Sequence, residues 1–333
     1  MNERLIIRSF GAPHDVVEHI ASEGIARPLK EGEMLVRILA SPINPADLNW
    51  IAGNYGIRPL LPETPGSEAC AEVIDSRSTK FPAGARVIFL GYAHGWQKYC
   101  IAHENEVLQV PSAMDALQCA LLKVNPATAW LMIKAACSFS HGHAVIQNAA
   151  NSGVGQCVIQ FTRAMGIPCL SFLRRKEDHD FLRSLGAQAI FTDDAEGQEN
   201  ARDYLAEQKL KATLALNAVG GDSALRQLDL LEPQSLHLTY GAMSRRPLTI
   251  PNKFLIFQNL RIHGFWLSSW MKQTPHHEIL DVYEKMLCMW QQHGMTQRVD
   301  STYQLADFSA ALDRNSAPQK CGKVLFAGKS SFA

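Results

Sequence analysis

The chain has 333 residues, enough for about two domains with sizeable cores. Hydrophobic residues make up 47% and charged residues 19%, proportions typical of a globular protein, and no apolar run approaches the roughly 18 residues of a membrane-spanning helix. The formal net charge is zero and no long basic tract occurs, so electrostatics do not support binding to nucleic acid or to a membrane surface.

The cellular compartment is predicted from the cysteines and from the first residues. The eight cysteines form no C-x-x-C pair and most have apolar neighbours, so we interpret them as buried thiols in a reducing compartment. The amino-terminal sequence MNERLIIRSF leads directly into a strand pattern and lacks the composition of a signal or transit peptide. We therefore expect a cytoplasmic protein.

The first third of the chain is predicted to be an all-β unit of barrel type. Short apolar strands alternate with Gly, Pro and Asn turns, which is typical of barrels. The predicted strands cover residues 5–7, 34–40, 69–74, 86–89, 96–101 and 107–110. Residues 112–137 are predicted to be helical with a break at Asn125-Pro126, because proline lacks the N–H that a continuing helix needs.

A strand, a turn of small residues and a helix follow in the sequence HAVIQNAANSGVGQCVIQ, residues 143–160. Backbone N–H groups at such a helix start are unpaired and lie at the positive end of the helix dipole, so they can bind a cofactor phosphate. Compared with the dinucleotide pattern G-x-G-x-x-G, the turn keeps only the third glycine, Gly155. Taken alone, it suits any α/β protein equally well.

A second apolar strand, residues 168–173, ends in three cations: Arg174, Arg175 and Lys176. They lie about 20 residues beyond the turn, where the adenosine ribose of a dinucleotide is expected. An acidic residue there would select NAD through the 2′-hydroxyl, whereas cations suit a 2′-phosphate, so the pattern favours NADP(H). A solvated basic turn is the alternative interpretation.

Strands and helices continue to alternate in the second half. Further strands are predicted at residues 189–192, 212–217, 236–240 and 260–264, and helices at 178–185, 196–208, 223–231 and 276–293. This alternation implies a parallel sheet covered by helices on both faces, and residues 323–326 form a strand that can return to the β-unit. The predicted fold class is therefore α/β, with an all-β unit and a doubly wound Rossmann-type unit.

This organisation resembles the medium-chain dehydrogenase/reductase superfamily. Within it, six strings resemble the 2-enoyl thioester reductases of the mitochondrial fatty-acid synthesis type: SPINPADLNWIAGNYG, VNPATAW, VIQNAANSGVGQ, LALNAVGG, TYGAM and GFWLSSW. The resemblance implies a GroES-like catalytic domain over residues 1–111, completed by about residues 296–333. It also implies a Rossmann NADP-binding domain with connecting helices over residues 112–295.

Zinc alcohol dehydrogenases of this superfamily hold a catalytic metal through a cysteine, the histidine of a Gly-His-Glu triplet and a later cysteine. Here the triplet reads Gly66-Ser67-Glu68, the first loop reads Asn44-Pro45-Ala46-Asp47, and the later position falls near Asn125. The thiolates and the imidazole that tetrahedral zinc needs are missing, so we expect no metal.

The resemblance also implies roles for individual residues. Tyr55, in the string NYG, is the implied proton donor. The alternative is that Tyr55 only packs over a loop, and Tyr92 and Tyr240 are rival candidates for the donor. The implied NADPH contacts, with the three cations at the 2′-phosphate, are Asn125, Asn151, Ser152, Gly153, Val154, Arg174, Arg175, Lys176, Tyr240, Gly241, Ala242, Met243, Phe265, Trp266, Leu267 and Lys323.

The implied reaction is the NADPH-dependent reduction of the 2,3 double bond of a trans-2-enoyl thioester, carried by coenzyme A or acyl carrier protein. Hydride adds at Cβ and Tyr55 protonates Cα, because a tyrosine hydroxyl is protonated at neutral pH. Alternatives are an NADPH:quinone or alkenal oxidoreductase and a non-catalytic NADPH-binding sensor. Three cations, Arg245, Arg246 and Lys253, either bind the carrier's phosphates or form a solvated face. The apolar stretch 248–260 predicts a homodimer.

Overall fold

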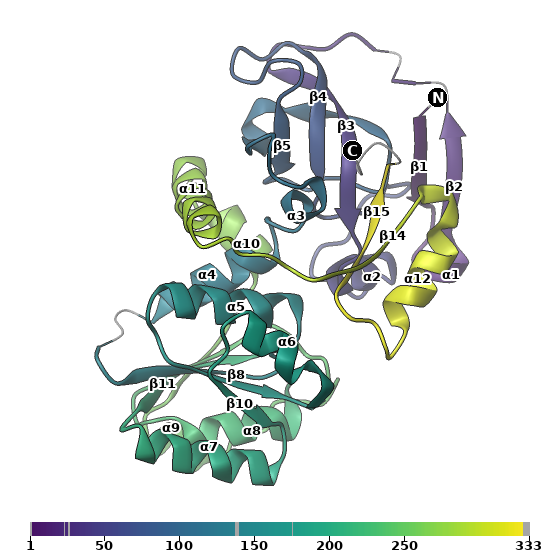
Figure 1. The fold of residues 1–333 in the computed structure, drawn as a ribbon. Helices are drawn as coiled ribbons and strands as arrows, with labels where there is room; N and C mark the ends of the chain where they lie inside the picture. Colours follow the sequence, from purple (N-terminus) through teal and green to yellow (C-terminus); the bar gives the residue numbers. More distant parts are fainter. Residues whose placement is uncertain (1, 23, 26, 137–139, 175, 329–333) are drawn as a thin grey trace. The chain divides into compact units, whose positions relative to one another are not determined.

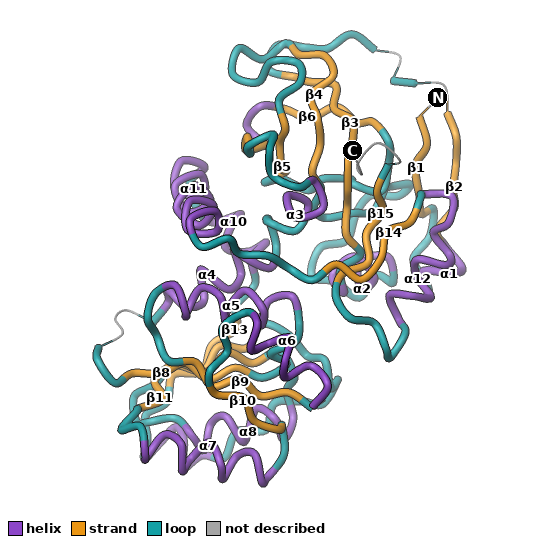
Figure 2. The backbone as a smooth tube through the Cα atoms, in the orientation of Figure 1, coloured by secondary structure: helices purple, strands orange, loops and turns teal. Residues whose placement is uncertain are grey.

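The structure, a computed structural model, describes residues 2–22, 24–25, 27–136, 140–174 and 176–328. The chain divides into two compact units (Figures 1 and 2). Unit 1 comprises Met1–Val124 and Gln297–Ala333, and unit 2 comprises Asn125–Thr296. Among the described residues, no helix has both the length and the apolar character needed to cross a membrane.

Unit 1 is built on a mainly antiparallel sheet with the strand order β14-β15-β3-β4-β5-β7. Strand β3 is the longest, and it also pairs with β6 along its first half. Its side chains alternate between buried and half-buried at first and are nearly all buried toward its end, as expected where a strand enters the core. The strands are β1 (Asn2–Ile7), β2 (Val17–Ser22), β3 (Glu33–Pro42), β4 (Cys70–Ser76), β5 (Arg86–Phe89), β6 (Tyr99–His103), β7 (Val107–Gln109), β14 (Val299–Tyr303) and β15 (Lys323–Ala327).

The carboxy-terminal strand confirms the predicted return to the β-unit, because β15 pairs with the end of β3. Strand β14 lies beside it in parallel, and β2 forms a separate hairpin with β1. Neither β2 nor β14 was predicted. The helices of unit 1 are short: α1 (Pro13–Val16), α2 (Pro45–Ile51), α3 (Ala116–Ala120) and α12 (Phe308–Ser316).

Unit 2 contains the predicted parallel sheet, in the order β10-β9-β8-β11-β12-β13. This is the doubly wound order in which the chain runs outward in both directions from its two central strands. Helices α5 and α6 lie on one face, and α7, α8 and α9 on the other (Figure 1). The strands are β8 (His143–Gln147), β9 (Cys169–Leu173), β10 (Ala189–Thr192), β11 (Lys211–Asn217), β12 (Leu236–Thr239) and β13 (Arg261–Gly264).

The helices of unit 2 begin with α4, whose start corrects the predicted break at Asn125-Pro126. Helix α3 already ends at Ala120, and Pro126 lies in the first turn of α4, where backbone N–H groups have no helical partner to lose. The helices are α4 (Asn125–Ala135), α5 (Gly153–Ala164), α6 (His179–Ser184), α7 (Ala195–Glu207), α8 (Gly221–Leu230), α9 (Asn252–Ile256), α10 (Leu267–Gln273) and α11 (His276–Gln292).

Candidate functional site

The turn between β8 and α5 is a tight helix start. Ser152 is the N-cap of α5, and its Oγ accepts a hydrogen bond from the Gly155 N–H at 3.1 Å. A Cβ at Gly155 would lie only 2.5 Å from the Ala150 carbonyl oxygen. Only glycine therefore allows the helix to begin this close to the strand end, and the helix N-terminus lies at the carboxyl edge of the sheet.

Buried amide side chains join the ends of the central strands at this edge. The Asn148 Nδ2 donates to Asn217 Oδ1 at 2.8 Å and to Ser223 Oγ at 2.8 Å. Asn217 Nδ2 in turn donates to Thr239 Oγ1 at 3.1 Å. The network links β8, β11, β12 and α8, so it holds the loops at the carboxyl edge in fixed positions. Sequence reasoning missed Asn148, although an asparagine directly after a buried strand was a usable signal.

The segments after β12 and β13 are held to the same edge by backbone hydrogen bonds. Met243 N–H donates to the Ala218 carbonyl at 3.0 Å, and Phe265 N–H donates to the Thr239 carbonyl at 2.8 Å. The predicted cofactor contacts in these segments differ in exposure. Buried or half-buried are Tyr240, Gly241, Phe265 and Leu267, whereas Ala242, Met243 and Trp266 are exposed.

Tyr240 places a buried hydroxyl beside the β8–α5 turn. The hydroxyl faces Ser152 but meets no partner at hydrogen-bonding geometry among the described residues, and burial raises its pKa. A buried polar group without a partner is costly, so it favours a ligand that supplies one. This orphaned hydroxyl and the helix N-terminus fit the phosphates and ribose of a dinucleotide.

The predicted 2′-phosphate site follows β9. Arg174 and Lys176 are exposed, and Arg175 lies outside the described residues. The Asn151 Nδ2 donates to the buried Asp178 Oδ2 at 2.7 Å, which ties the β8–α5 turn to the segment carrying these cations. The structure therefore brings together Asn151, Ser152, Gly153, Val154, Arg174, Lys176 and Tyr240. Asn125 lies buried at the start of α4.

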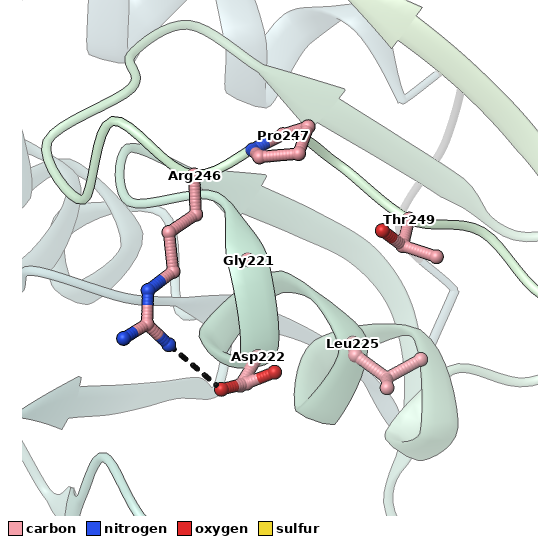
Figure 3. A pocket seen from close by; sticks show the side chains of 6 residues that line it. All are labelled: Gly221, Asp222, Leu225, Arg246, Pro247 and Thr249. Atoms are coloured by element: carbon pink, nitrogen blue, oxygen red, sulfur yellow. Dashed lines mark hydrogen bonds and ion pairs between the residues drawn. The ribbon is translucent and has the colours of Figure 1, made fainter.

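A shallow pocket of about 200 Å³ lies beside the first turns of α8 (Figure 3). Arg246 reaches from the loop after β12 toward Asp222, and its Nη1 lies 3.2 Å from the Asp222 Oδ2 in an exposed pair. Lys253 similarly lies 3.5 Å from Asp229. Exposed pairs of this kind contribute little energy, and they favour the solvated-face interpretation of Arg246 and Lys253.

Unit 1 contains a cluster of buried polar and charged side chains, Asn44, Asp47, Glu68 and Lys123, with the half-buried Lys323 beside them. The Glu68 carboxylate accepts from Asn44 Nδ2 and from the Val124 N–H, both at 2.8 Å. Asp47 accepts from the Asn44 N–H at 2.9 Å and from the Ser67 N–H at 2.9 Å. Burial raises the pKa of both carboxyl groups, and these hydrogen bonds oppose the rise.

Two ammonium groups balance this cluster. The Lys123 Nζ donates to the Ser67 carbonyl at 2.7 Å and to the Gly91 carbonyl, and burial lowers its pKa to about 8. The Lys323 Nζ donates to Asn44 Oδ1. Lys323, predicted to contact the cofactor, thus has a partner within unit 1, and the buried Lys123 was missed. In the described residues, no three His, Cys, Asp or Glu side chains gather as a metal site requires.

Tyr55 follows α2 and packs, half-buried, on an apolar cluster of unit 1 that includes Ile51 and Trp96. Helix α2 is fixed at its start by a capping box between Asn44 and Asp47. Its end is equally close-packed, because a Cβ at Gly53 would lie 3.1 Å from Phe10. The Tyr55 side chain is therefore carried by a well-anchored loop, next to Tyr92 on the same cluster.

Comparison with known proteins agrees with this geometry. A family model described as alcohol dehydrogenase GroES-like domain matches residues 30–112, and one described as zinc-binding dehydrogenase matches residues 153–285. The mitochondrial enoyl-[acyl-carrier-protein] reductase of Homo sapiens is 34% identical over 94% of this chain and 85% of its own length. That of Caenorhabditis elegans is 34% identical over 83% of this chain and 81% of its own length.

Two solved structures are similar over 98% of this chain and 99% of theirs, each with 25% identity and a TM-score of 0.88. One is the Etr1p/NADP/crotonyl-CoA complex, and the other is a putative NADPH:quinone reductase from Bacillus thuringiensis. With its GroES-like unit and Rossmann-type unit, the chain is an oxidoreductase of the medium-chain dehydrogenase/reductase superfamily. It belongs to the family of the mitochondrial enoyl-[acyl-carrier-protein] reductases.

The comparison corrects one prediction, the cytoplasmic location. The relatives from human, nematode and frog are named as mitochondrial proteins, and they point to the mitochondrion instead. The prediction used cysteine surroundings and local composition, which indicate a reducing environment without distinguishing one such compartment from another.

Proposed function

We propose that the chain catalyses the NADPH-dependent reduction of the 2,3 double bond of a trans-2-enoyl thioester, carried by coenzyme A or acyl carrier protein. The observation that carries the proposal is the family membership together with Tyr55 on its anchored loop after α2. The Etr1p complex with NADP and crotonyl-CoA, similar over 98% of this chain, supports the same chemistry.

The cofactor is NADP(H), which when bound supplies a hydride to Cβ of the substrate. The start of α5 after Ser152 binds the pyrophosphate, and the Tyr240 hydroxyl gains the partner that the protein lacks there. Arg174 and Lys176 bind the 2′-phosphate, and the loops at Gly241–Met243 and Phe265–Leu267 line the cofactor. Asn125 and Lys323 are further cofactor contacts in this proposal.

Tyr55 completes the reaction in unit 1. Hydride addition at Cβ moves the π electrons of the double bond toward the thioester carbonyl and leaves an enolate. The Tyr55 O–H bond then breaks, its proton goes to Cα, and water reprotonates the tyrosine. The thioester carbonyl is restored, so the net change is one hydride and one proton added across the double bond.

The test is the loss of NADPH absorbance with crotonyl-coenzyme A, run with NADH and with crotonyl-acyl carrier protein in parallel. Turnover with NADPH and little with NADH is the expected result. Replacing Tyr55 by phenylalanine is expected to lower turnover by about 10²-fold, the contribution of a positioned general acid. Unchanged turnover in this variant would remove Tyr55 from the proposal.

A second candidate is the NADPH-dependent reduction of a quinone or an alkenal on the same scaffold, favoured by the similarity to the putative quinone reductase. Quinone reduction does not require protonation at a carbon atom, so Tyr55→Phe should leave it almost unchanged. Rapid quinone reduction without thioester turnover would favour this candidate.

The assembly is proposed to be a homodimer through residues 248–260 and β13. Strand β13 ends the sheet order, and in the segment before it Leu255, Ile256 and Phe257 are 44%, 68% and 82% exposed. An open strand edge next to an apolar patch is a typical pairing surface. Light scattering of the wild type should give twice the chain mass. Phe257→Asp should reduce the mass to that of one chain, whereas the control Leu60→Asp, at an exposed residue of unit 1, should leave it unchanged. A wild-type mass equal to one chain refutes the dimer.

A further inference from the structure

Tyr92, in the loop between β5 and β6, has a buried hydroxyl that the proposed reaction has not used. The hydroxyl oxygen meets no hydrogen-bond partner among the described residues, although the Gly66 backbone lies near it. Leaving a buried hydroxyl unpaired costs stability, and each such group in a folded protein requires an explanation. A ligand that accepts its proton in a hydrogen bond is one explanation.

The Tyr92 ring is held on several sides. It stacks on Trp50 of α2 with ring centres 5.4 Å apart and an interplanar angle of 21°, and it meets His94 edge-on at 4.9 Å. His94 Nδ1 lies 3.1 Å from Glu63 Oε1. The backbone is held as well, because the carbonyl of Gly91, the residue before Tyr92, accepts a hydrogen bond from the buried Lys123 ammonium. Because the ring and its loop are fixed, the hydroxyl cannot swing out to find a partner in water.

Tyr92 and Tyr55 share one surface of unit 1. Both pack on the same apolar cluster, and helix α2 connects them, because Trp50 supports the Tyr92 ring and Tyr55 lies just beyond the end of the helix. The two side chains also interact electrostatically. A substrate bound at the Tyr55 hydroxyl therefore lies against the same cluster that carries Tyr92.

The surroundings suit Tyr92 to donating a hydrogen bond and not to releasing a proton. Burial raises the pKa of Tyr92, and the nearby carboxylates of Asp47 and Glu63 raise it further. Such a hydroxyl stays protonated at every working pH, so it is a permanent donor but a poor general acid. Its role therefore differs from the one proposed for Tyr55.

We propose that the Tyr92 hydroxyl donates a hydrogen bond to the thioester carbonyl oxygen and stabilises the enolate that hydride addition forms there. This inference rests on the proposed function. When the hydride bonds to Cβ, the π electrons shift from the double bond to the carbonyl oxygen, where the donor meets the developing charge. No proton leaves Tyr92; the proton for Cα comes from Tyr55, and the carbonyl re-forms.

The kinetic test measures hydride transfer in a single turnover, as the loss of NADPH absorbance with crotonyl-coenzyme A. Tyr92→Phe should slow this step by about 10²-fold, since removing one oxyanion donor typically costs 10²–10³-fold. The matched control is Tyr303→Phe, which removes a hydroxyl from the same cluster and should leave the rate unchanged. A rate for Tyr92→Phe within about threefold of wild type overturns the inference.

The second readout does not depend on turnover. Isotope-edited infrared spectra of ¹³C-carbonyl crotonyl-coenzyme A, bound in the presence of NADP⁺, report hydrogen bonding to the carbonyl directly. We expect the stretch to be lowered in wild type, Tyr55→Phe and Tyr303→Phe, and to return toward the free value only in Tyr92→Phe. The same stretch in all four proteins overturns the inference even if Tyr92→Phe is slow. A wild type that binds and reduces no thioester refutes the proposed function itself, and the inference with it.

Discussion

Replacing His237 by leucine is expected to stabilise unit 2, and by more as the pH falls. His237 lies in β12, fully buried, in register with Ala215 on one neighbouring strand and Ile262 on the other. Among the described residues neither ring nitrogen has a hydrogen-bond partner. The imidazole is thus a polar group inside an apolar layer, and burial lowers its pKa from the ordinary 6.5 to about 4.

Two contributions set the size of the effect. At pH 7 His237 is neutral in both the folded and unfolded chain. The substitution therefore raises the free energy of unfolding only by removing an unpaired polar group, which contributes about 1–3 kcal/mol. Below pH 6.5 the unfolded chain binds a proton that the folded chain does not, so wild-type stability is lost as the pH falls from 6.5 toward 4. At about 1.4 kcal/mol per pH unit, this adds about 2 kcal/mol at pH 5 and about 3 kcal/mol at pH 4.

The assay is urea unfolding of wild type and His237→Leu between pH 7 and pH 4.5, followed by tryptophan fluorescence. Taking the difference between the two proteins at each pH cancels the titration of all other groups. His277→Leu, at an exposed histidine of α11, is the matched control for the loss of an imidazole. A free-energy difference for His237→Leu that is constant over this range would refute the reasoning, because it would mean that the imidazole is as easily protonated folded as unfolded.

Three further substitutions test the sites described above. Arg174→Ala should weaken NADPH binding at least tenfold while leaving NADH binding nearly unchanged, as measured by fluorescence titration; equal losses would remove the 2′-phosphate assignment. Gly155→Ala should destabilise unit 2 by about 1–3 kcal/mol and weaken NADPH binding, because its Cβ would press on the Ala150 carbonyl; wild-type binding and stability would contradict this. Lys123→Met should lower the free energy of unfolding by about 3–5 kcal/mol, because it leaves buried carboxylates without a balancing charge, whereas Lys272→Met, at an exposed residue, should change it by less than about 0.5 kcal/mol.

The parallel sheet was predictable because its signals are local. Each strand of unit 2 is a short apolar run followed by a turn and a helix, so the alternation alone implies the doubly wound arrangement. The elements that were missed depend on distant partners. Strand β14 is half-buried throughout and has no apolar face of its own, and it forms only because β15 pairs with it.

The buried charges of unit 1 illustrate a second limit. Lys123 stands between Leu122 and Val124, and a single lysine beside apolar residues is compatible with either a surface or a buried position. Its burial is decided by carbonyl groups at Ser67 and Gly91, more than thirty residues away along the chain. Strings shared with a family indicate which residues belong to a site, but the partner of a buried ammonium follows only from the three-dimensional contacts.

These contacts also explain how unit 1 holds its loops in place. In zinc-holding members of the superfamily, by the resemblance described above, the loop at Asn44–Asp47 and the triplet at Gly66–Glu68 approach a metal. In this chain Asp47 bonds to the Ser67 N–H, Asn44 bonds to Glu68, and Lys123 spans from Ser67 to the Gly91 carbonyl beside Tyr92. Two carboxylates and two ammonium groups thus take part in joining these loops. Because α2 begins in this cluster and ends before Tyr55, the same contacts fix both tyrosine side chains, and the acid and the hydrogen-bond donor of the proposed reaction share one support.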